Sequence, residues 1–104
     1  MKYLIIDGYL NGTGIRDKYE SGYIALSELN LSAALSERIE MWLQNYWNEF
    51  YANYPDKDKV ADLDAEGVEI TRAVAREMPD EYKLEYFSDA RMRFIPWKTQ
   101  NDNK

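Results

Sequence analysis

Asp7 and Asp89 are the residues whose positions best suit carboxylate chemistry. Each lies at the end of a run with the pattern of a buried strand, residues 2–7 and 82–87. If these strands are parallel, both carboxylates emerge at one sheet edge, where α/β proteins place ligands. Such a pair could hold Mg²⁺ or act as acid and base, but aspartates also commonly end strands. Since no third ligand or activated nucleophile is evident, we favour binding of a basic partner.

A second candidate for ion binding is Asp62–Gly67, which matches the start of a calcium-binding loop of the EF-hand type. The twelfth position of that loop should be a bidentate Glu, and here it is Ala73. Leu63, Gly67 and Ile70 also have helical spacing. We therefore interpret this segment as an acidic helix start, which the helix dipole favours.

The glycines after the first strand do not form a phosphate-binding loop. The spacing of Gly8, Gly12 and Gly14 fits neither common nucleotide-binding motif, so turns are the better interpretation. The chain has no Cys and no His. These absences remove Cys–His and Ser–His–Asp catalysis and ordinary zinc, copper or haem ligation. We predict that the protein is not an enzyme and uses no metal and no cofactor.

The charge and length limit the class of protein further. The 104 residues carry 13 basic and 19 acidic side chains, a net charge of −6. This balance argues against direct nucleic-acid binding and fits a basic protein partner. No apolar run approaches a signal-peptide core or a membrane span, so we expect a cytoplasmic protein without membrane contact. We predict one domain over residues 1–98 and a flexible polar tail over residues 99–104.

The clearest predicted element is a helix that begins after Ser32, a good N-cap, and ends near Ala52, before Pro55. Spacings of four, three, four and four residues place one apolar stripe on it. That stripe consists of Leu35, Ile39, Trp42, Tyr46 and Phe50.

A second helix is predicted over residues 58–78, with an apolar stripe that includes Gly67. Because glycine costs a helix about 1 kcal/mol relative to Ala, close packing is expected there. Residues 23–26 are predicted as a short edge strand or an extended loop. Residues 92–97 are expected to add a last short strand, which Pro96 confines to an edge.

The predicted order is β, loop or hairpin, α, α, β, with the short edge strand at the C-terminus. A crossover through two helices usually joins parallel neighbouring strands. We therefore predict an α/β (α+β) fold, in which two long helices pack on one face of a small mixed sheet.

The first helix is the most informative candidate for a binding surface. It combines aromatic side chains with an acidic excess, and exposed aromatics ringed by carboxylates suit a basic protein partner. The alternative is a helix covered on two sides, with a solvated acidic back. The predicted partner-binding residues are Trp47, Glu49, Tyr51, Tyr54, Asp56, Asp7, Asp89, Asp17 and Glu20.

Two parts of the chain carry a resemblance to a known group of proteins. Residues 23–43 read YIALSELNLS, then LSERI and WL, and residues 60–77 are followed by EYFSD at 85–89. These stretches resemble the small acidic immunity proteins of bacterial polymorphic toxins, including those of contact-dependent growth inhibition systems. The resemblance covers most of residues 1–89. Such families share no common functional residues.

The resemblance implies a cytosolic protein that binds and neutralises one cognate toxin domain, often a nuclease. Toxin nucleases need basic clefts, which an acidic partner can fill as a substrate mimic or block from beside the cleft. Both routes stay open, as do the interface and the oligomeric state. The alternatives are a Mg²⁺-assisted phosphohydrolase using Asp7 and Asp89, and a structural module that self-associates through its Trp and Tyr side chains.

Overall fold

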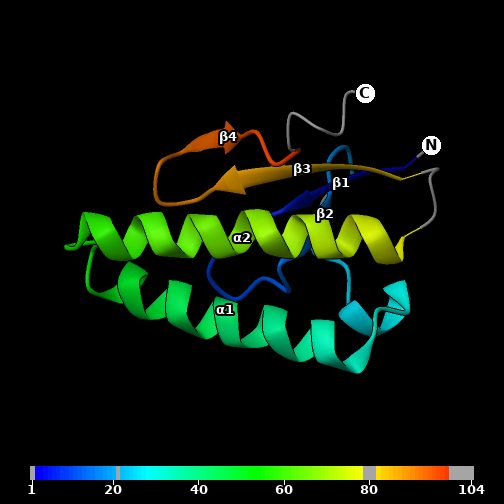
Figure 1. The fold of residues 1–104 in the computed structure, drawn as a ribbon, viewed down its shortest axis with the longest axis horizontal. Coiled ribbons are helices and arrows are strands. Elements are labelled where there is room, and N and C mark those ends of the chain that lie inside the picture. Colours follow the sequence, from blue (N-terminus) through cyan, green and yellow to red (C-terminus); the bar gives the residue numbers. More distant parts are fainter. Residues whose placement is uncertain (1, 21, 79–81, 99–104) are drawn as a thin grey trace.

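The computed structural model describes residues 2–20, 22–78 and 82–98. Its helices and strands follow the predicted order, with one additional strand in the segment after the first strand (Figure 1). The elements are β1 (Lys2–Ile6), β2 (Ile15–Asp17), the 3-10 helix η1 (Leu26–Leu29), α1 (Ala33–Tyr51), α2 (Lys57–Glu77), β3 (Tyr82–Ser88) and β4 (Arg93–Ile95). The predicted tail at 99–104 lies outside the described residues.

The sheet has the order β2-β1-β3-β4. β1 and β3 pair in parallel, with Lys2 opposite Tyr82 and Ile6 opposite Tyr86, which confirms the predicted crossover through two helices. β2 and β4 are antiparallel edge strands. The mixed sheet is therefore the one expected from the sequence.

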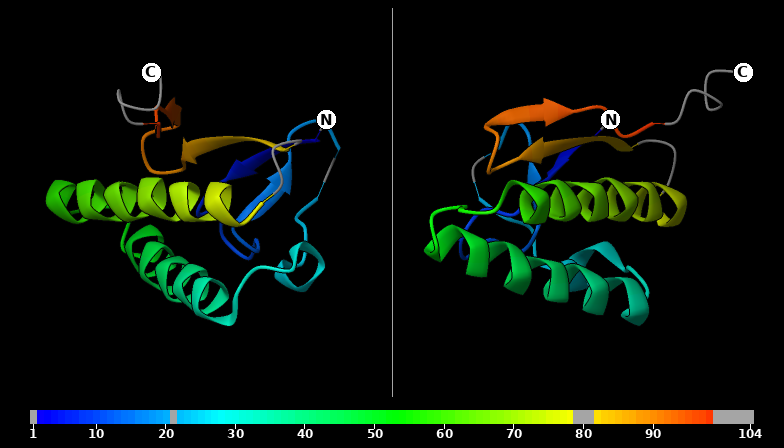
Figure 2. Two further views of the ribbon diagram at one scale, coloured as in Figure 1. Left: turned by 45° about the vertical axis from the view of Figure 1, so that its right-hand side comes forward. Right: turned by 60° about the vertical axis from the view of Figure 1, so that its left-hand side comes forward.

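Helices α1 and α2 lie on the same side of the sheet, and no helix of the described residues covers its other face (Figure 2). The core forms between the sheet and the helices. Its largest fully buried side chains are Trp42, Tyr46 and Tyr86. Strand β3 alternates in burial, with Leu84, Tyr86 and Ser88 buried.

Helix α1 begins as predicted, because the Ser32 hydroxyl accepts a hydrogen bond from the Leu35 amide at 3.2 Å. The predicted apolar stripe is buried as far as Tyr46. Phe50 does not continue it, since it is 40% exposed. Leu43, which is not part of the predicted stripe, is only 4% exposed. The buried face of α1 is therefore rotated slightly from the predicted one near its C-terminal end.

Helix α2 contains the expected close approach at Gly67. A Cβ atom at this position would lie 2.4 Å from the Tyr86 ring, far closer than side-chain carbons approach. Because glycine has no Cβ atom, the ring of Tyr86 in β3 packs directly on the backbone of α2. The same device occurs at Gly8, where a Cβ would lie 2.6 Å from the Tyr46 ring.

The segment between β1 and α1 was predicted as a loop or a hairpin, and the hairpin forms, because β2 pairs antiparallel with β1. A strand forms at 15–17, and residues 23–26 do not form one. Tyr23 makes only an isolated bridge to Arg16, and Leu26 already begins η1. Of the two alternatives predicted for residues 23–26, a short edge strand or an extended loop, the structure therefore has the loop.

Candidate functional site

The parallel pairing of β1 and β3 brings Asp7 and Asp89 to one edge of the sheet, here called the carboxyl edge. Asp7 follows β1 directly, and Asp89 follows β3 directly. This juxtaposition is the one predicted from the sequence. The two carboxylates differ sharply in their surroundings.

The carboxylate of Asp7 is buried and hydrogen-bonded within the protein. It is 2% exposed and accepts hydrogen bonds from the Arg16 Nε at 2.8 Å, the Tyr23 hydroxyl at 2.7 Å and the Tyr9 amide at 3.3 Å. Burial and the bond to Asp7 raise the pKa of the Tyr23 hydroxyl. Asp7 therefore ties the loop after β1 to β2, and it presents little of itself to a partner.

Asp89 is the accessible carboxylate of this edge. It is partly buried, and the Tyr54 hydroxyl donates to it at 3.4 Å. Burial, and then the charge of Asp7, raise the pKa of Asp89. Tyr54 and Asp89 were predicted on separate surfaces, and the structure brings them together.

Asp64 is a buried, hydrogen-bonded carboxylate that is absent from the residues predicted for the site. It is 3% exposed in α2. It accepts hydrogen bonds from the hydroxyls of Tyr86 at 2.6 Å, Ser88 at 2.7 Å and Tyr46 at 3.3 Å. The Arg91 Nε lies 3.4 Å away and supplies a positive charge. This network joins both helices to the end of β3.

A signal for Asp64 was present in the sequence. It lies four residues after Val60 and three before Gly67, within the buried stripe of α2. A carboxylate in such a stripe needs buried donors. Those donors come from β3 and α1, and burial raises the pKa of Tyr46 to about 12 and that of Tyr86 further. Asp64 therefore supports the scaffold.

Aromatic residues at the end of α1 have different roles. Trp47 is partly buried, and its indole N–H lies 3.1 Å from the carbonyl oxygens of both Gly8 and Tyr9. Tyr51, by contrast, is 73% exposed. Trp47 thus holds the loop after β1 against α1, while Tyr51 is free to contact a partner.

Glu49 lies on the side of α1 that faces α2. Its side chain is 14% exposed, and its Oε2 lies 3.9 Å from the Lys59 Nζ. Its Oε1 is buried and has no hydrogen-bond partner among the described residues. A buried acceptor without a donor costs about 1–3 kcal/mol, so this carboxylate is set up to accept another donor.

The remaining three predicted residues lie apart. Asp56 is the N-cap of α2 and accepts from the Asp58 amide at 2.9 Å. Asp17 lies opposite Leu4, away from the carboxyl edge, and the amides of Glu20 and Tyr19 lower its pKa. Glu20 is exposed, three residues after Asp17. The structure therefore does not assemble all predicted residues into one surface.

Helix α1 presents a continuous exposed stripe, here called the α1 ridge. Its members recur at spacings of four, three, four and three residues, and all are exposed. Met41 and Tyr51 are 68% and 73% exposed, and Glu37 has no ion-pair partner within the described ranges. The α1 ridge consists of Glu37, Met41, Gln44, Asn48 and Tyr51.

A hollow lies beside the α1 ridge, between α1 and α2, and is here called the inter-helix groove. Its two cavities, about 510 and 390 Å³, share Asn45, Asp62 and Leu63 and therefore lie next to each other. Four carboxylates line it against two cations. Its charged residues are Glu37, Arg38, Glu49, Lys59, Asp62 and Glu66.

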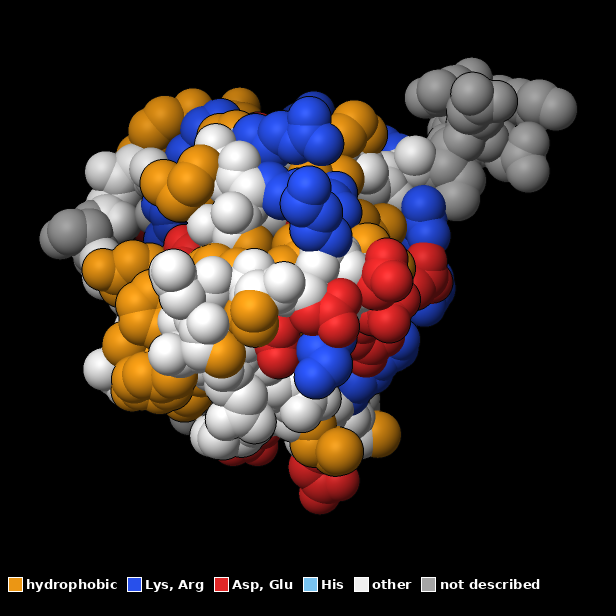
Figure 3. All heavy atoms as spheres, turned by 90° about the vertical axis from the view of Figure 1, so that its left-hand side faces the viewer, with side chains coloured by type: hydrophobic (Ala, Val, Ile, Leu, Met, Phe, Trp, Pro, Cys, Tyr) orange, Lys and Arg blue, Asp and Glu red, His pale blue; other side chains and the backbone are white. Residues whose placement is uncertain are grey.

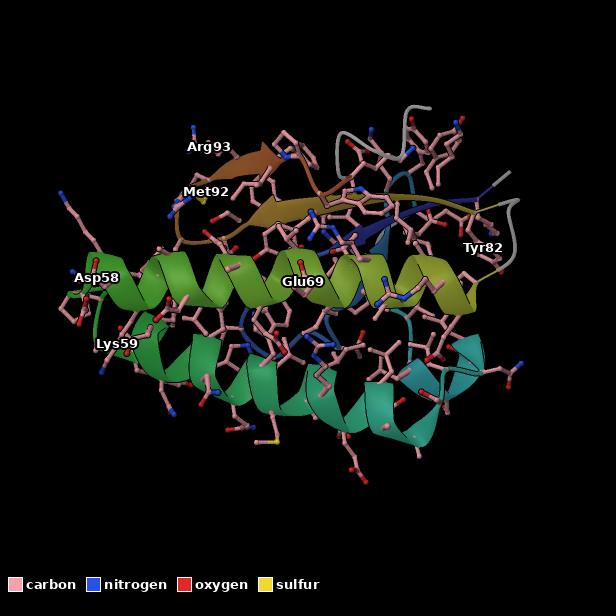
Figure 4. The ribbon with its side chains drawn as sticks, in the orientation of Figure 1. Asp58, Lys59, Glu69, Tyr82, Met92 and Arg93 are labelled. Carbon is pink, nitrogen blue, oxygen red and sulfur yellow. The ribbon has the colours of Figure 1, made fainter. Side chains whose placement is uncertain are left out.

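Charge is distributed unevenly over the molecule. Figure 3 looks onto the end where α1 joins α2, with Lys and Arg gathered at the top, over the sheet, and acidic side chains mainly lower, at the level of the helices. Figure 4 shows Met92 and Arg93 at this same end, above Asp58 and Lys59 at the start of α2. The carboxyl edge is thus aromatic and of mixed charge, and the acidic excess belongs to the helices.

Two further observations concern the described residues alone. No three carboxylates in them gather as a metal-binding group. Of the helices in these ranges, none is both long enough and apolar enough to cross a membrane.

Comparison with known proteins places the chain in a family. A family model described as Serratia CdiI immunity protein-like matches residues 10–89, from the loop after β1 through both helices to Asp89. No curated protein and no solved structure matches the chain. The matched region is well over half of the chain, and immunity proteins act by neutralising a toxin. The chain therefore belongs to the Serratia CdiI immunity protein-like family and is an immunity protein for a cognate toxin.

Proposed function

We propose that this protein acts in the cytoplasm, without catalysis, by covering the active site of a basic toxin nuclease with its α1 ridge and inter-helix groove. The observation that carries the proposal is the ridge itself. It combines two exposed anchor residues, Met41 and Tyr51, with one carboxylate, Glu37, that has no cationic partner in the described chain. A basic, nucleic-acid-binding cleft has the complementary chemistry.

The charge of the helical layer supports the same partner. Residues 26–78 contain eleven acidic and five basic side chains. Such an excess speeds association with a basic surface and makes the association rate sensitive to salt. Since the excess belongs to the helical layer, a basic cleft is drawn toward the layer that offers the anchors.

The carboxyl edge gives less support to an enzyme. The alternative phosphohydrolase requires Asp7 and Asp89 to share a metal ion or a substrate. Asp7 is buried and already accepts three hydrogen bonds. A catalytic role would have to break these bonds, so we propose a structural role for Asp7. If millimolar Mg²⁺ raised the melting temperature, and Asp7→Asn abolished that rise, the enzyme would be favoured instead.

The test compares two matched pairs of exposed side chains. Met41 and Tyr51 lie on the α1 ridge, and Met92 and Tyr19 lie outside the helical layer with 73% and 72% exposure. The toxin domain encoded in the neighbouring reading frame serves as the probe, with affinity measured by calorimetry and inhibition by a nuclease assay.

We expect the double variant Met41→Ala, Tyr51→Ala to lose at least about tenfold in affinity, because each anchor of an interface typically contributes more than about 1 kcal/mol. The pair Met92→Ala, Tyr19→Ala should bind like the unaltered protein. Equal losses in both pairs would argue against the α1 ridge. No binding or inhibition by the unaltered protein would refute the proposed partner.

A further inference from the structure

We propose that the inter-helix groove receives an arginine side chain of the toxin, held by Glu49 and Asp62. This inference rests on the proposed function and specifies the chemistry of the contact. Both residues line the same cavity, together with Asn45 and Asn48. The groove therefore offers several acceptors to one donor group.

The two cations of the inter-helix groove do not balance its four carboxylates. Arg38 is neutralised by Glu66, since its Nε and Nη2 donate to the two carboxylate oxygens at 2.7 and 2.8 Å. This pair satisfies both partners. Asp62 has no cation within ion-pair distance in the described residues, so one uncompensated carboxylate faces the cavity.

Lys59 is a weak counter-ion for Glu49. The Nζ lies 3.9 Å from Oε2, and its side chain is 64% exposed. The ammonium group makes no hydrogen bond to Glu49 at this distance. Lys59 can thus move aside into solvent and leave Oε2 of Glu49 to a cation of the partner, while the buried Oε1 has no donor among the described residues.

A guanidinium group matches these needs better than an ammonium group does. It presents five N–H donors in one plane and binds carboxylates through two bonds at once. Met41 and Leu63 line the adjoining cavity and offer an apolar wall for the methylene stem of an arginine. We therefore assign the groove to arginine and not to lysine.

The first experiment measures binding of the toxin domain from the neighbouring reading frame to Glu49→Gln and Asp62→Asn. Each change keeps the shape and removes one charge. Glu20→Gln is the matched control, because it removes the same charge from an exposed site in the sheet layer. Circular dichroism melts verify that each variant is folded.

We expect each groove variant to lose roughly 10- to 100-fold in affinity, as is typical for losing a hydrogen bond to a charged group. Glu20→Gln should lose less than about threefold, the range expected of a remote charge that makes no contact. Unchanged affinity of both groove variants, with tight binding by the unaltered protein, would overturn the arginine site and leave the proposed function standing.

A second experiment tests the groove without the toxin. Ethylguanidinium is titrated into the ¹⁵N-labelled protein, and the side-chain amide signals of Asn45 and Asn48 are followed by NMR. These signals should shift in the unaltered protein and shift less in Glu49→Gln. Ethylammonium should produce smaller shifts.

Equal shifts in the unaltered protein and in Glu49→Gln would overturn the site, as would equal shifts with the two cations. A toxin domain that fails to bind at all refutes the proposed function, and the small-cation titration still decides separately whether the groove recognises guanidinium. The two failures are therefore distinguishable.

Discussion

The helical layer and the sheet layer of this protein expose similar apolar side chains, but the first has an excess of acidic residues and the second an excess of basic ones. The helical layer, residues 26–78, carries eleven acidic and five basic side chains, whereas residues 2–25 and 82–98 carry five acidic and seven basic ones. Met41 and Tyr51 are exposed on the first, and Met92 and Tyr19 on the second. Exposed apolar area alone therefore does not identify the binding surface.

On the face of the sheet that no described helix covers, charged and aromatic side chains contact one another. The Lys18 Nζ donates to Glu85 on β3 at 2.6 Å and lies 5.9 Å from the centre of the Phe94 ring. Phe94 packs edge-on against Phe87, with ring centres 5.0 Å apart. Ile5 is 2% exposed even though no helix covers this face. Internal pairing thus closes the surface over β1.

The helical layer leaves carboxylates without partners. Within the described ranges, Glu37, Glu40 and Asp62 have no cation at ion-pair distance, and Glu69 is the partner of Arg72 along the same helix. Glu69 points away from α1 (Figure 4). A surface charge that is already paired contributes little to the free energy of binding, whereas an unpaired carboxylate can form a favourable contact with a cationic partner. The comparison therefore favours the helices as the toxin-binding layer.

The largest effect is expected from breaking the link between the two layers. Asp64→Ala leaves the buried hydroxyls of Tyr86 and Ser88 without their acceptor and should lower the free energy of unfolding by about 3–5 kcal/mol. Urea denaturation measures this loss. Asp62→Ala, two residues away on the exposed side, should change stability by less than about 0.5 kcal/mol.

The comparison of Asp64→Ala with Asp62→Ala distinguishes a role in folding from a role in binding. If Asp62→Ala destabilised the protein as much as Asp64→Ala, the assignment of one to the scaffold and the other to the groove would be wrong. If Asp64→Ala lost less than about 1 kcal/mol, its network would not join the layers as described.

A smaller effect should follow from reversing one charge in each layer. Glu40→Lys and Glu20→Lys each alter an exposed residue without an ion-pair partner in the described chain. We expect Glu40→Lys to slow toxin association severalfold at low salt and to flatten its salt dependence. Stopped-flow measurements over a range of salt concentrations test this expectation. An equal slowing by Glu20→Lys would mean that the net charge matters, and not the layer.

The smallest effect is expected at the carboxyl edge, where the layers meet. Because the pKa of Asp89 is raised in the folded protein, the native state binds its proton more readily than the unfolded chain does, and the contribution of Asp89 to stability falls as pH rises above 3.8. Asp89→Asn should therefore be slightly more stable than the unaltered protein at pH 7. The difference should vanish once the pH is below the unfolded-state pKa. Denaturation of both proteins at each pH measures it, and a less stable variant at pH 7 would contradict the sign.

Much of the fold followed from local patterns. Ser32 and the apolar spacing after it define α1, and the run at 2–6 with the run at 82–88 defines the two central strands. Two consecutive helices between those strands required a crossover, and hence their parallel pairing. The segment at 23–26 was harder, because a single bridge and a 3-10 turn leave no periodic signal.

The sequence by itself determined the acidic first helix, the juxtaposition of Asp7 with Asp89 and the resemblance to immunity proteins. Only the tertiary structure decided which carboxylates are available. Asp7 and Asp64 are buried among donors from other elements, while Glu49 lies between two helices with one oxygen unpaired. Exposure and pairing depend on residues distant in the chain, so spacing along one helix could not reveal them.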